Sequence, residues 1–163
     1  MVNKLTLGVL IMMVAFIGTS NRANAQSGSD QVIGNWMSAE KNLIVQVYRE
    51  GDDFKAKVIW FDDSDDPSKP MESRIDDSNP DKSLRTRKII GMQVLRNLAY
   101  SPSTHSWENG MIYDAKSGRE WNAAASIDKA GMLRVTGYWH FKFIGKTMKF
   151  SRVTPSEIMM VSR

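Results

Sequence analysis

The chain has 163 residues, a formal net charge of +4 and no cysteine. This length suits a single domain with a sizeable core, and the lack of cysteine excludes disulfides, thiol catalysis and zinc–cysteine sites. Two of the basic residues, Lys4 and Arg22, precede residue 26, so the rest of the chain is only weakly basic. That balance argues against a dedicated nucleic-acid-binding protein, and we expect no nucleic-acid partner.

The first 25 residues have the pattern of a secretory signal peptide. Lys4 is followed by an apolar run at 5–17 and then by Ala23-Asn24-Ala25, which is the order of a positive segment, a hydrophobic segment and a small-residue cleavage site. The apolar run is shorter than the roughly 20 residues of a membrane-spanning helix. We therefore expect cleavage after Ala25, export to the periplasm or beyond, and one mature domain over residues 26–163.

Short apolar runs separated by turn residues follow one another along the rest of the chain. In the run 54–61, Phe54, Ala56, Val58 and Trp60 alternate with the other residues, which favours a half-buried strand. The links between runs are mostly short and contain glycine, as β-hairpins require. The predicted strands are 32–37, 43–50, 54–61, 89–98, 107–114, 119–127, 132–141 and 147–153.

These strands predict an all-β fold. We expect an antiparallel meander closed into a β-barrel of about eight strands, because closure removes the exposed strand edges. The interior of such a barrel either fills with side chains or holds one small ligand. No window after residue 25 has a helical period. The C-terminal segment 154–163 is expected to add a short final strand or to hang free, and Gly91 is expected to form a bulge in its strand.

Gly34-Asn35-Trp36 lies in the first predicted strand and Arg152 in the last. In the lipocalin superfamily a Gly-x-Trp on the first strand packs beneath an arginine of the last strand, and this chain looks similar. The aromatic ring would plug one end of the barrel, with the guanidinium stacked on its face. The alternative is that Trp36 is an ordinary core residue.

The charged segment between the third and fourth strands carries the most specific motif. It contains Asp76, Asn79-Pro80-Asp81, Leu84-Arg85 and Arg87, and Gly91 follows. Further along stand Gly110, Tyr113-Asp114, Gly118, Gly137-Tyr138, Gly145-Lys146-Thr147 and Ser151-Arg152-Val153. With these groups and Gly34-x-Trp36, the chain resembles the bacterial domain-of-unknown-function family numbered 2147 over about residues 32–153.

This resemblance implies an exported, lipocalin-like protein that binds a small apolar molecule, and it brings no established activity. The chain departs from the family pattern in three places. It lacks a pair of cysteines around the turn at 50–53, and Trp121 and Phe150 stand where tyrosine and tryptophan are more usual. Both exchanges keep an aromatic ring, so a packing role remains consistent with the pattern.

The charged motif has two interpretations. Arg85 and Arg87 are two residues apart, so on a strand they would point the same way. They could clamp Asp76 or Asp81, or they could bind a carboxylate or phosphate of a ligand. We favour the clamp, because acidic residues are abundant nearby. Asp76 is expected to accept backbone N–H groups, and Asn79-Pro80 to form an extended turn that helps to fix the loop.

Three other kinds of chemistry are weakly supported. The acidic stretch 61–72 suits calcium by composition, but it lacks the glycine and the final acid of an EF-hand, so a solvated loop is the favoured interpretation and no metal is expected. The chain holds two histidines, His105 and His140, and no known catalytic motif joins them to a nucleophile. We expect no cofactor, and an enzyme is the least favoured class.

The last part of the chain, 129–163, holds seven basic residues, one acid and several aromatic residues. This composition is compatible with peripheral contact with an anionic envelope surface. The simpler interpretation is a set of strands with apolar side chains inward and lysines outward.

The leading hypothesis is a barrel whose cavity binds a small apolar or amphipathic molecule. The alternative is a filled barrel that acts as an envelope interaction or structural protein. Along 138–141, Tyr138 and His140 are expected to share one face of a strand. The candidate ligand-binding residues are Trp60, Arg85, Arg87, Tyr113, Tyr138 and His140, and the candidate structural residues are Gly34, Trp36, Asp76, Asn79, Pro80, Gly91 and Arg152.

Overall fold

The computed structural model describes residues 28–162. The predicted signal peptide and its cleavage site therefore lie outside the described residues. Within 28–162, no helix has both the length and the apolar character needed to cross a membrane.

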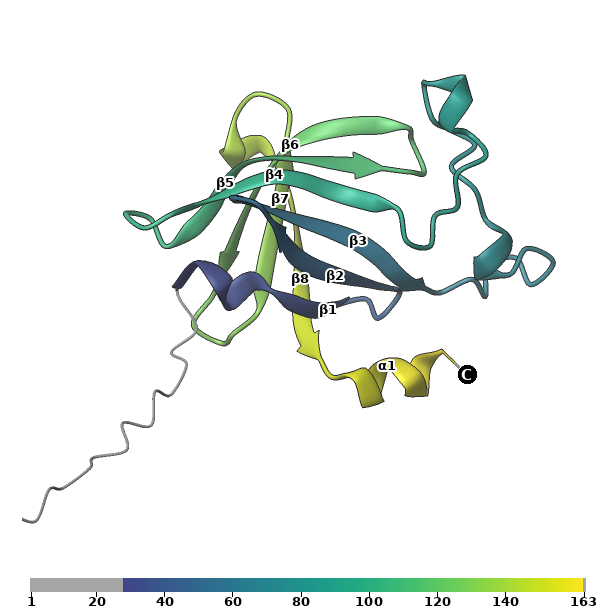
Figure 1. Cartoon of the computed structure of the whole chain (residues 1–163), viewed down its shortest axis with the longest axis horizontal. Helices are drawn as coiled ribbons and strands as arrows, with labels where there is room; N and C mark the ends of the chain where they lie inside the picture. Colours follow the sequence, from purple (N-terminus) through teal and green to yellow (C-terminus); the bar gives the residue numbers. More distant parts are fainter. Residues whose placement is uncertain (1–27, 163) are drawn as a thin grey trace, which may run out of the picture.

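Eight antiparallel strands form one closed barrel, in which each strand pairs with the next and β1 pairs with β8 (Figure 1). The strands are β1 (Gly34–Ser38), β2 (Leu43–Glu50), β3 (Asp53–Phe61), β4 (Gln93–Ser101), β5 (Ser106–Asp114), β6 (Arg119–Ile127), β7 (Leu133–Tyr138) and β8 (Lys146–Val153). The predicted all-β meander and its closure are confirmed. Because every strand has two neighbours, the barrel has no free sheet edge.

One end of the barrel is filled by side chains. The 3-10 helix η1 (Gly28–Val32) precedes β1 at this end, and the indole N–H of Trp107 donates to the carbonyl of Ser29 at 3.0 Å. Six side chains here are almost completely buried: Val32, Trp36, Phe54, Leu98, Trp107 and Leu133. Alternation along the strands turns these residues inward and forms the main core.

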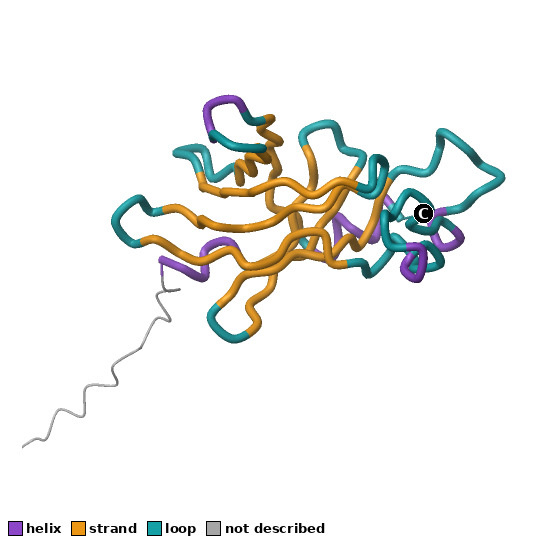
Figure 2. The backbone as a smooth tube through the Cα atoms, turned by 90° about the horizontal axis from the view of Figure 1, so that it is seen from above, coloured by secondary structure: helices purple, strands orange, loops and turns teal. Residues whose placement is uncertain are grey.

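The opposite end carries the longest connection of the barrel, residues 62–92 between β3 and β4, which we call the mouth connection. It contains two short 3-10 helices, η2 (Met71–Ser73) and η3 (Lys82–Leu84). Figure 1 shows this connection at the far end from η1, and Figure 2 shows the loops gathered at that end of the strands. The turn between β1 and β2 and the hairpin between β5 and β6 lie at the same end.

A bulge in β3 changes which side chains face inward. Ile44 pairs with Trp60 whereas the next residue, Val45, pairs with Val58, so Ile59 is an extra residue in β3. Up to Val58 the predicted alternation holds, and beyond the bulge it reverses. Trp60 is therefore turned to the outer face of the barrel, and the residue after it, Phe61, is turned inward.

The C-terminal segment is a helix, α1 (Pro155–Val161), so the expectation of a short strand or a free tail was wrong. Thr154 and Glu157 form a reciprocal capping box, and Pro155 occupies the first turn. Ile158 packs against an outer-face cluster of Met37, Ile44 and Val153, which Trp60 also joins. The sequence signal was the run Thr-Pro-Ser-Glu, a typical helix start, which is too short to produce a helical period.

Two predicted strands begin or end three or more residues away from their positions in the structure. The fourth strand begins at Gln93 rather than at residue 89, and Gly91 lies in the turn before it with φ +80°, not in a bulge of the strand. The seventh strand ends at Tyr138 rather than at 141, because residues 139–145 turn away through the 3-10 helix η4 (Lys142–Ile144). Tyr138 and His140 therefore do not share a strand face.

Candidate ligand cavity

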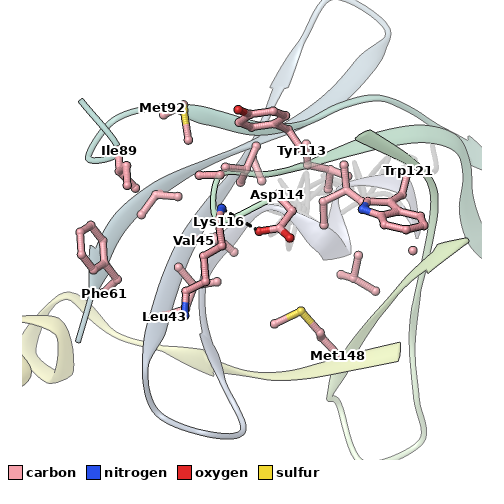
Figure 3. Close-up of a pocket in the computed structure, with 18 of the residues that line it drawn as sticks. Leu43, Val45, Phe61, Ile89, Met92, Tyr113, Asp114, Lys116, Trp121 and Met148 are labelled. Carbon is pink, nitrogen blue, oxygen red and sulfur yellow. Dashed lines mark hydrogen bonds between the residues drawn. The ribbon is translucent and has the colours of Figure 1, made fainter. Parts of the chain in front are cut away.

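A cavity opens at the mouth end of the barrel, and together with its mouth it has a volume of about 1930 Å³. Its walls are apolar side chains from several strands and from the mouth connection (Figure 3). They include Leu43, Val45, Phe61, Ile89, Met92, Val94, Ile112, Trp121, Val135 and Met148. The cavity also touches Val32, Leu98 and Leu133, so the packed half of the barrel beside η1 forms the floor of a hollow half beside the mouth connection.

Burial supports this division. At the filled end, Leu98 is 0% exposed and Leu133 is 1% exposed. Toward the mouth, the inward-facing Leu43, Ile112 and Met148 are only partly buried. The barrel therefore contains a cavity, as the leading hypothesis requires, beside a well-packed core.

The rim of the cavity is charged. Acidic side chains come from the β1–β2 turn, the mouth connection and the end of β5: Glu40, Asp62, Asp65, Asp66, Asp77 and Asp114. Basic side chains on the rim are Lys69, Arg74, Lys116 and Lys146. Figure 3 shows Asp114 and Lys116 together near the cavity, where the backbone N–H of Lys116 donates to the Asp114 carboxylate at 3.0 Å. An apolar interior below a charged rim suits a molecule with one apolar and one polar part.

A buried carboxylate fastens the mouth connection to the barrel. Asp76 is 0% exposed, and its carboxylate accepts hydrogen bonds at 2.7 Å from the amide of Asn79, the guanidinium of Arg87 and the hydroxyl of Tyr113 on β5. The Arg87 guanidinium also lies 5.8 Å from the centre of the Tyr113 ring. We call these four residues the latch. It joins the two ends of the charged motif to a wall strand of the cavity.

The latch shifts the pKa values of its acidic members. Burial alone would raise the pKa of Asp76, but the hydrogen bonds from Tyr113, Asn79 and Arg87 outweigh it and lower this pKa below its ordinary value of 3.8. Burial first, and then the hydrogen bond to the Asp76 carboxylate, raise the pKa of Tyr113 to about 12. Asp76 is therefore a carboxylate and Tyr113 a neutral phenol at neutral pH.

The predicted clamp between Arg87 and Asp76 is confirmed, with two corrections. Arg85 does not join it, because its Nε donates to the backbone carbonyl of Asn79 at 2.7 Å. The side chain of Asp76 is held by side-chain donors rather than by the backbone N–H groups that we expected. Neither arginine lies on a strand, since η3 and a turn replace the extended conformation that would have aligned them.

The hairpin between β5 and β6 supports the latch from the other side. Gly118 has φ +65°, and a Cβ at this position would collide with the backbone carbonyl of Ser78 and come within 3.4 Å of Pro80. Only glycine satisfies both conditions. Asn79 is buried beside Asp76, whereas Pro80 is exposed.

Arg74 organises the acidic stretch of the mouth connection. Its guanidinium pairs with the Asp65 carboxylate at 2.7 Å and donates to the carbonyls of Asp63 and Lys69 at 2.8 Å. The hydrogen bond from Arg74 is the main cause that lowers the pKa of Asp65. Across residues 28–162, no group of three or more His, Cys, Asp or Glu side chains is placed to hold a metal ion.

The structure brings together only part of the predicted ligand-binding set. Tyr113, Tyr138 and His140 line the cavity or its mouth. Trp60 lies on the outer face because of the β3 bulge, and the side chains of Arg85 and Arg87 are engaged with the motif itself. The prediction missed the apolar wall residues Phe61, Ile112 and Met148. Alternation along β5 and β8 was the available signal for Ile112 and Met148, whereas Phe61 faces inward only because of the bulge.

At the filled end, Trp36 and Arg152 are opposite each other on β1 and β8. The Arg152 guanidinium lies 4.3 Å from the centre of the Trp36 ring and donates to the carbonyls of Ile33 at 2.7 Å and Gln31 at 2.5 Å. The Trp36 indole N–H donates to the carbonyl of Val32 at 2.8 Å. Gly34 has φ +141°, and a Cβ here would collide with the Arg152 guanidinium. The predicted stacking is confirmed.

An eight-stranded antiparallel barrel with a stacked Trp–Arg pair at its filled end and an apolar cavity at the other has a lipocalin-like fold. The chain belongs to the family described as "Uncharacterized protein conserved in bacteria (DUF2147)", whose model matches residues 34–152. This match confirms the resemblance seen in the sequence.

The fold is similar to that of a solved structure from Helicobacter pylori, a protein described as belonging to the lipocalin family. The two chains are 21% identical, with a TM-score of 0.65 over 80% of this chain and 88% of the other. At this identity the likeness shows the fold alone. No curated protein matches the chain.

Proposed function

We propose that this protein is an exported binding protein that carries one small amphipathic molecule in the mouth half of its barrel. The observation that carries the proposal is the cavity of about 1930 Å³ with apolar walls and a charged rim. A lipocalin-like fold suggests small-molecule binding in general. The cavity adds the chemical class: an apolar part, such as an acyl chain or a ring system, lies among the wall residues, and a polar part meets the rim.

The latch supports this function by holding the mouth in one arrangement. It fixes the mouth connection to Tyr113, which lies at the edge of the cavity. A pre-formed cavity binds more tightly than one that must be ordered by the ligand, because less conformational entropy is lost on binding.

Export is part of the same proposal and rests on the sequence of residues 1–25. Outside the cytoplasm, such a carrier would move apolar molecules between membranes or from the medium to the cell. The mass of the protein recovered from the periplasm or the medium tests this step. We expect a chain that starts at Gln26, and an intact N-terminus would contradict the proposal of cleavage.

Native mass spectrometry of the purified protein, before and after extraction with organic solvent, tests the binding function. We expect an added mass that is lost on extraction and returns when an extract of membranes is added back. The variant Met148→Trp places a large ring in the hollow half and should abolish the added mass. Lys149→Trp is the matched control, because the next residue along β8 points to the outer face.

The outcome is decisive in either direction. A mass that matches the chain alone in every preparation, with no uptake from the extract, would contradict the carrier function. The same result would favour a barrel that works through its surface. An added mass retained equally by Met148→Trp and Lys149→Trp would place the bound molecule outside the cavity.

A further inference from the structure

The loop between β7 and β8 keeps four large apolar side chains in water. Residues 139–145, which we call the aromatic loop, contain Trp139, Phe141, Phe143 and Ile144, which are 61%, 58%, 84% and 73% exposed. Soluble proteins rarely leave such a contiguous apolar group without a partner. The loop therefore has the character of an interaction surface.

The aromatic loop is held in place although its side chains are exposed. The turn η4 is closed by backbone hydrogen bonds, and Lys142 forms an ion pair with Glu108 on β5. The rings of Phe141 and Phe143 stack at 5.5 Å between centres, and Trp139 packs edge-on against Trp121 at 5.4 Å. These contacts join the loop to β5 and β6, while Phe141, Phe143 and Ile144 stay exposed.

Charge indicates what covers this surface. Lys142 lies within the aromatic loop and Lys146 follows it directly, and residues 133–153 hold no acidic residue. The acidic side chains of the rim come from other segments, namely the β1–β2 turn, the mouth connection and the end of β5. Aromatic rings flanked by lysines are typical of segments that lie at the boundary between water and lipid, where anionic headgroups attract the lysines.

We propose that the aromatic loop docks the mouth of the barrel onto a lipid surface that contains anionic headgroups. Phe141, Phe143 and Ile144 enter the headgroup region, and Lys146 contacts the headgroups. Trp139, His140 and Ile144 also line the mouth of the cavity. Docking through this loop therefore places the cavity opening at the membrane. An apolar molecule can then pass between the membrane and the cavity without crossing water.

Flotation with lipid vesicles tests the docking directly. The protein is expressed as the full chain and purified in whatever N-terminal form the cell produces. Mass spectrometry confirms that all variants share the same N-terminus. Vesicles of phosphatidylcholine alone are compared with vesicles that also contain phosphatidylglycerol. We expect at least tenfold stronger binding to the anionic vesicles, and we expect salt to weaken that binding.

Two matched double variants distinguish vesicle binding by the aromatic loop from non-specific binding by other exposed apolar residues. Phe141→Ser with Phe143→Ser should weaken binding to anionic vesicles at least tenfold. Met159→Ser with Met160→Ser is the control, because these residues of α1 are 62% and 74% exposed and lie outside the loop. It should change binding less than twofold. All four positions are exposed, so both variants should keep the wild-type melting temperature.

Three results would overturn the proposal. They are equal binding to both kinds of vesicle, equal loss of binding in the two double variants, and no binding at all. Sedimentation velocity without lipid tests whether the aromatic loop instead contacts a second copy of this chain. A dimer of the wild-type chain that the Phe141→Ser, Phe143→Ser variant dissociates would assign the loop to self-association instead. None of these results depends on whether the cavity holds a ligand, so docking and carriage are tested separately.

Discussion

The Arg152 guanidinium lies over the Trp36 ring, 4.3 Å from its centre, while the same guanidinium binds two carbonyls of the segment that leads into β1. The pair therefore joins the first strand to the last and secures η1 across the filled end. Burial lowers the pKa of Arg152 from its ordinary value. The closure of the barrel is therefore stabilised by this side-chain contact as well as by the backbone pairing of β1 with β8.

We expect Trp36→Ala and Arg152→Ala to have non-additive effects on the free energy of unfolding. Loss of the buried indole should cost about 3–5 kcal/mol, and loss of the more exposed guanidinium about 1 kcal/mol. Because the groups touch, a double-mutant cycle measured by denaturant unfolding should give a coupling of about 1 kcal/mol. Arg134 on β7 provides the control: Arg134→Ala combined with Trp36→Ala should be additive. Additive effects for Trp36 and Arg152 would show that the stacking contributes nothing.

Asp76→Asn should destabilise the protein by about 2–3 kcal/mol, because it leaves buried donors of the latch without a charged acceptor. The matched control is Asp77→Asn, an exposed position beside it, which should stay within about 0.5 kcal/mol of wild type. Thermal and denaturant unfolding measure both. If the two variants behaved alike, the latch would not contribute to stability.

The effect of Asp76→Asn should depend on pH in one direction. The folded-state pKa of Asp76 lies below its ordinary value of 3.8, so its stabilising effect is present above that pH and disappears as the pH falls through the folded-state pKa. The difference in unfolding free energy between wild type and variant should be constant near neutrality and should shrink below pH 3.8. A difference that grows on acidification would contradict the assigned direction of the shift.

Tyr113 should ionise only in strongly alkaline solution. Its pKa is raised to about 12, mainly by burial and then by its hydrogen bond to Asp76. In a near-ultraviolet titration, the difference between wild type and Tyr113→Phe should show a phenol that ionises near pH 12. The same difference measured in the Asp76→Asn background should move toward the ordinary value of 10.0. An unchanged titration there would mean that the carboxylate has no influence on the phenol.

Two tryptophans distinguish the cavity from the outer face. Trp121 lines the cavity, whereas Trp60 packs against the outer cluster beside α1. When a fluorescent fatty-acid analogue is added, Trp121→Phe should remove most of the ligand-dependent change in tryptophan fluorescence, and Trp60→Phe should leave it intact. The reverse pattern would place the ligand on the outer face.

The barrel could be predicted from the sequence because alternation and glycine-containing turns are local signals. All eight strands were located, and Trp36 and Arg152 could be paired through the family resemblance. The position of Trp60 could not be predicted, because the bulge at Ile59 depends on its register with β2. The latch was predicted only in part: Asp76 and Arg87 are close in sequence, whereas Tyr113 joins them through the closure of the barrel.

The mouth connection consists of two parts with different attachments. Residues 62–74 bind mainly to one another, through the carboxylates of Asp62, Asp63 and Asp66 and the guanidinium of Arg74. Residues 75–88 are joined at their ends by the bridge between Ile75 and Lys88 and held to the barrel by the latch. Residues 62–74 therefore form a locally held segment outside the latch. Replacing residues 62–74 with segments of other lengths should reshape the entrance of the cavity while the barrel still folds.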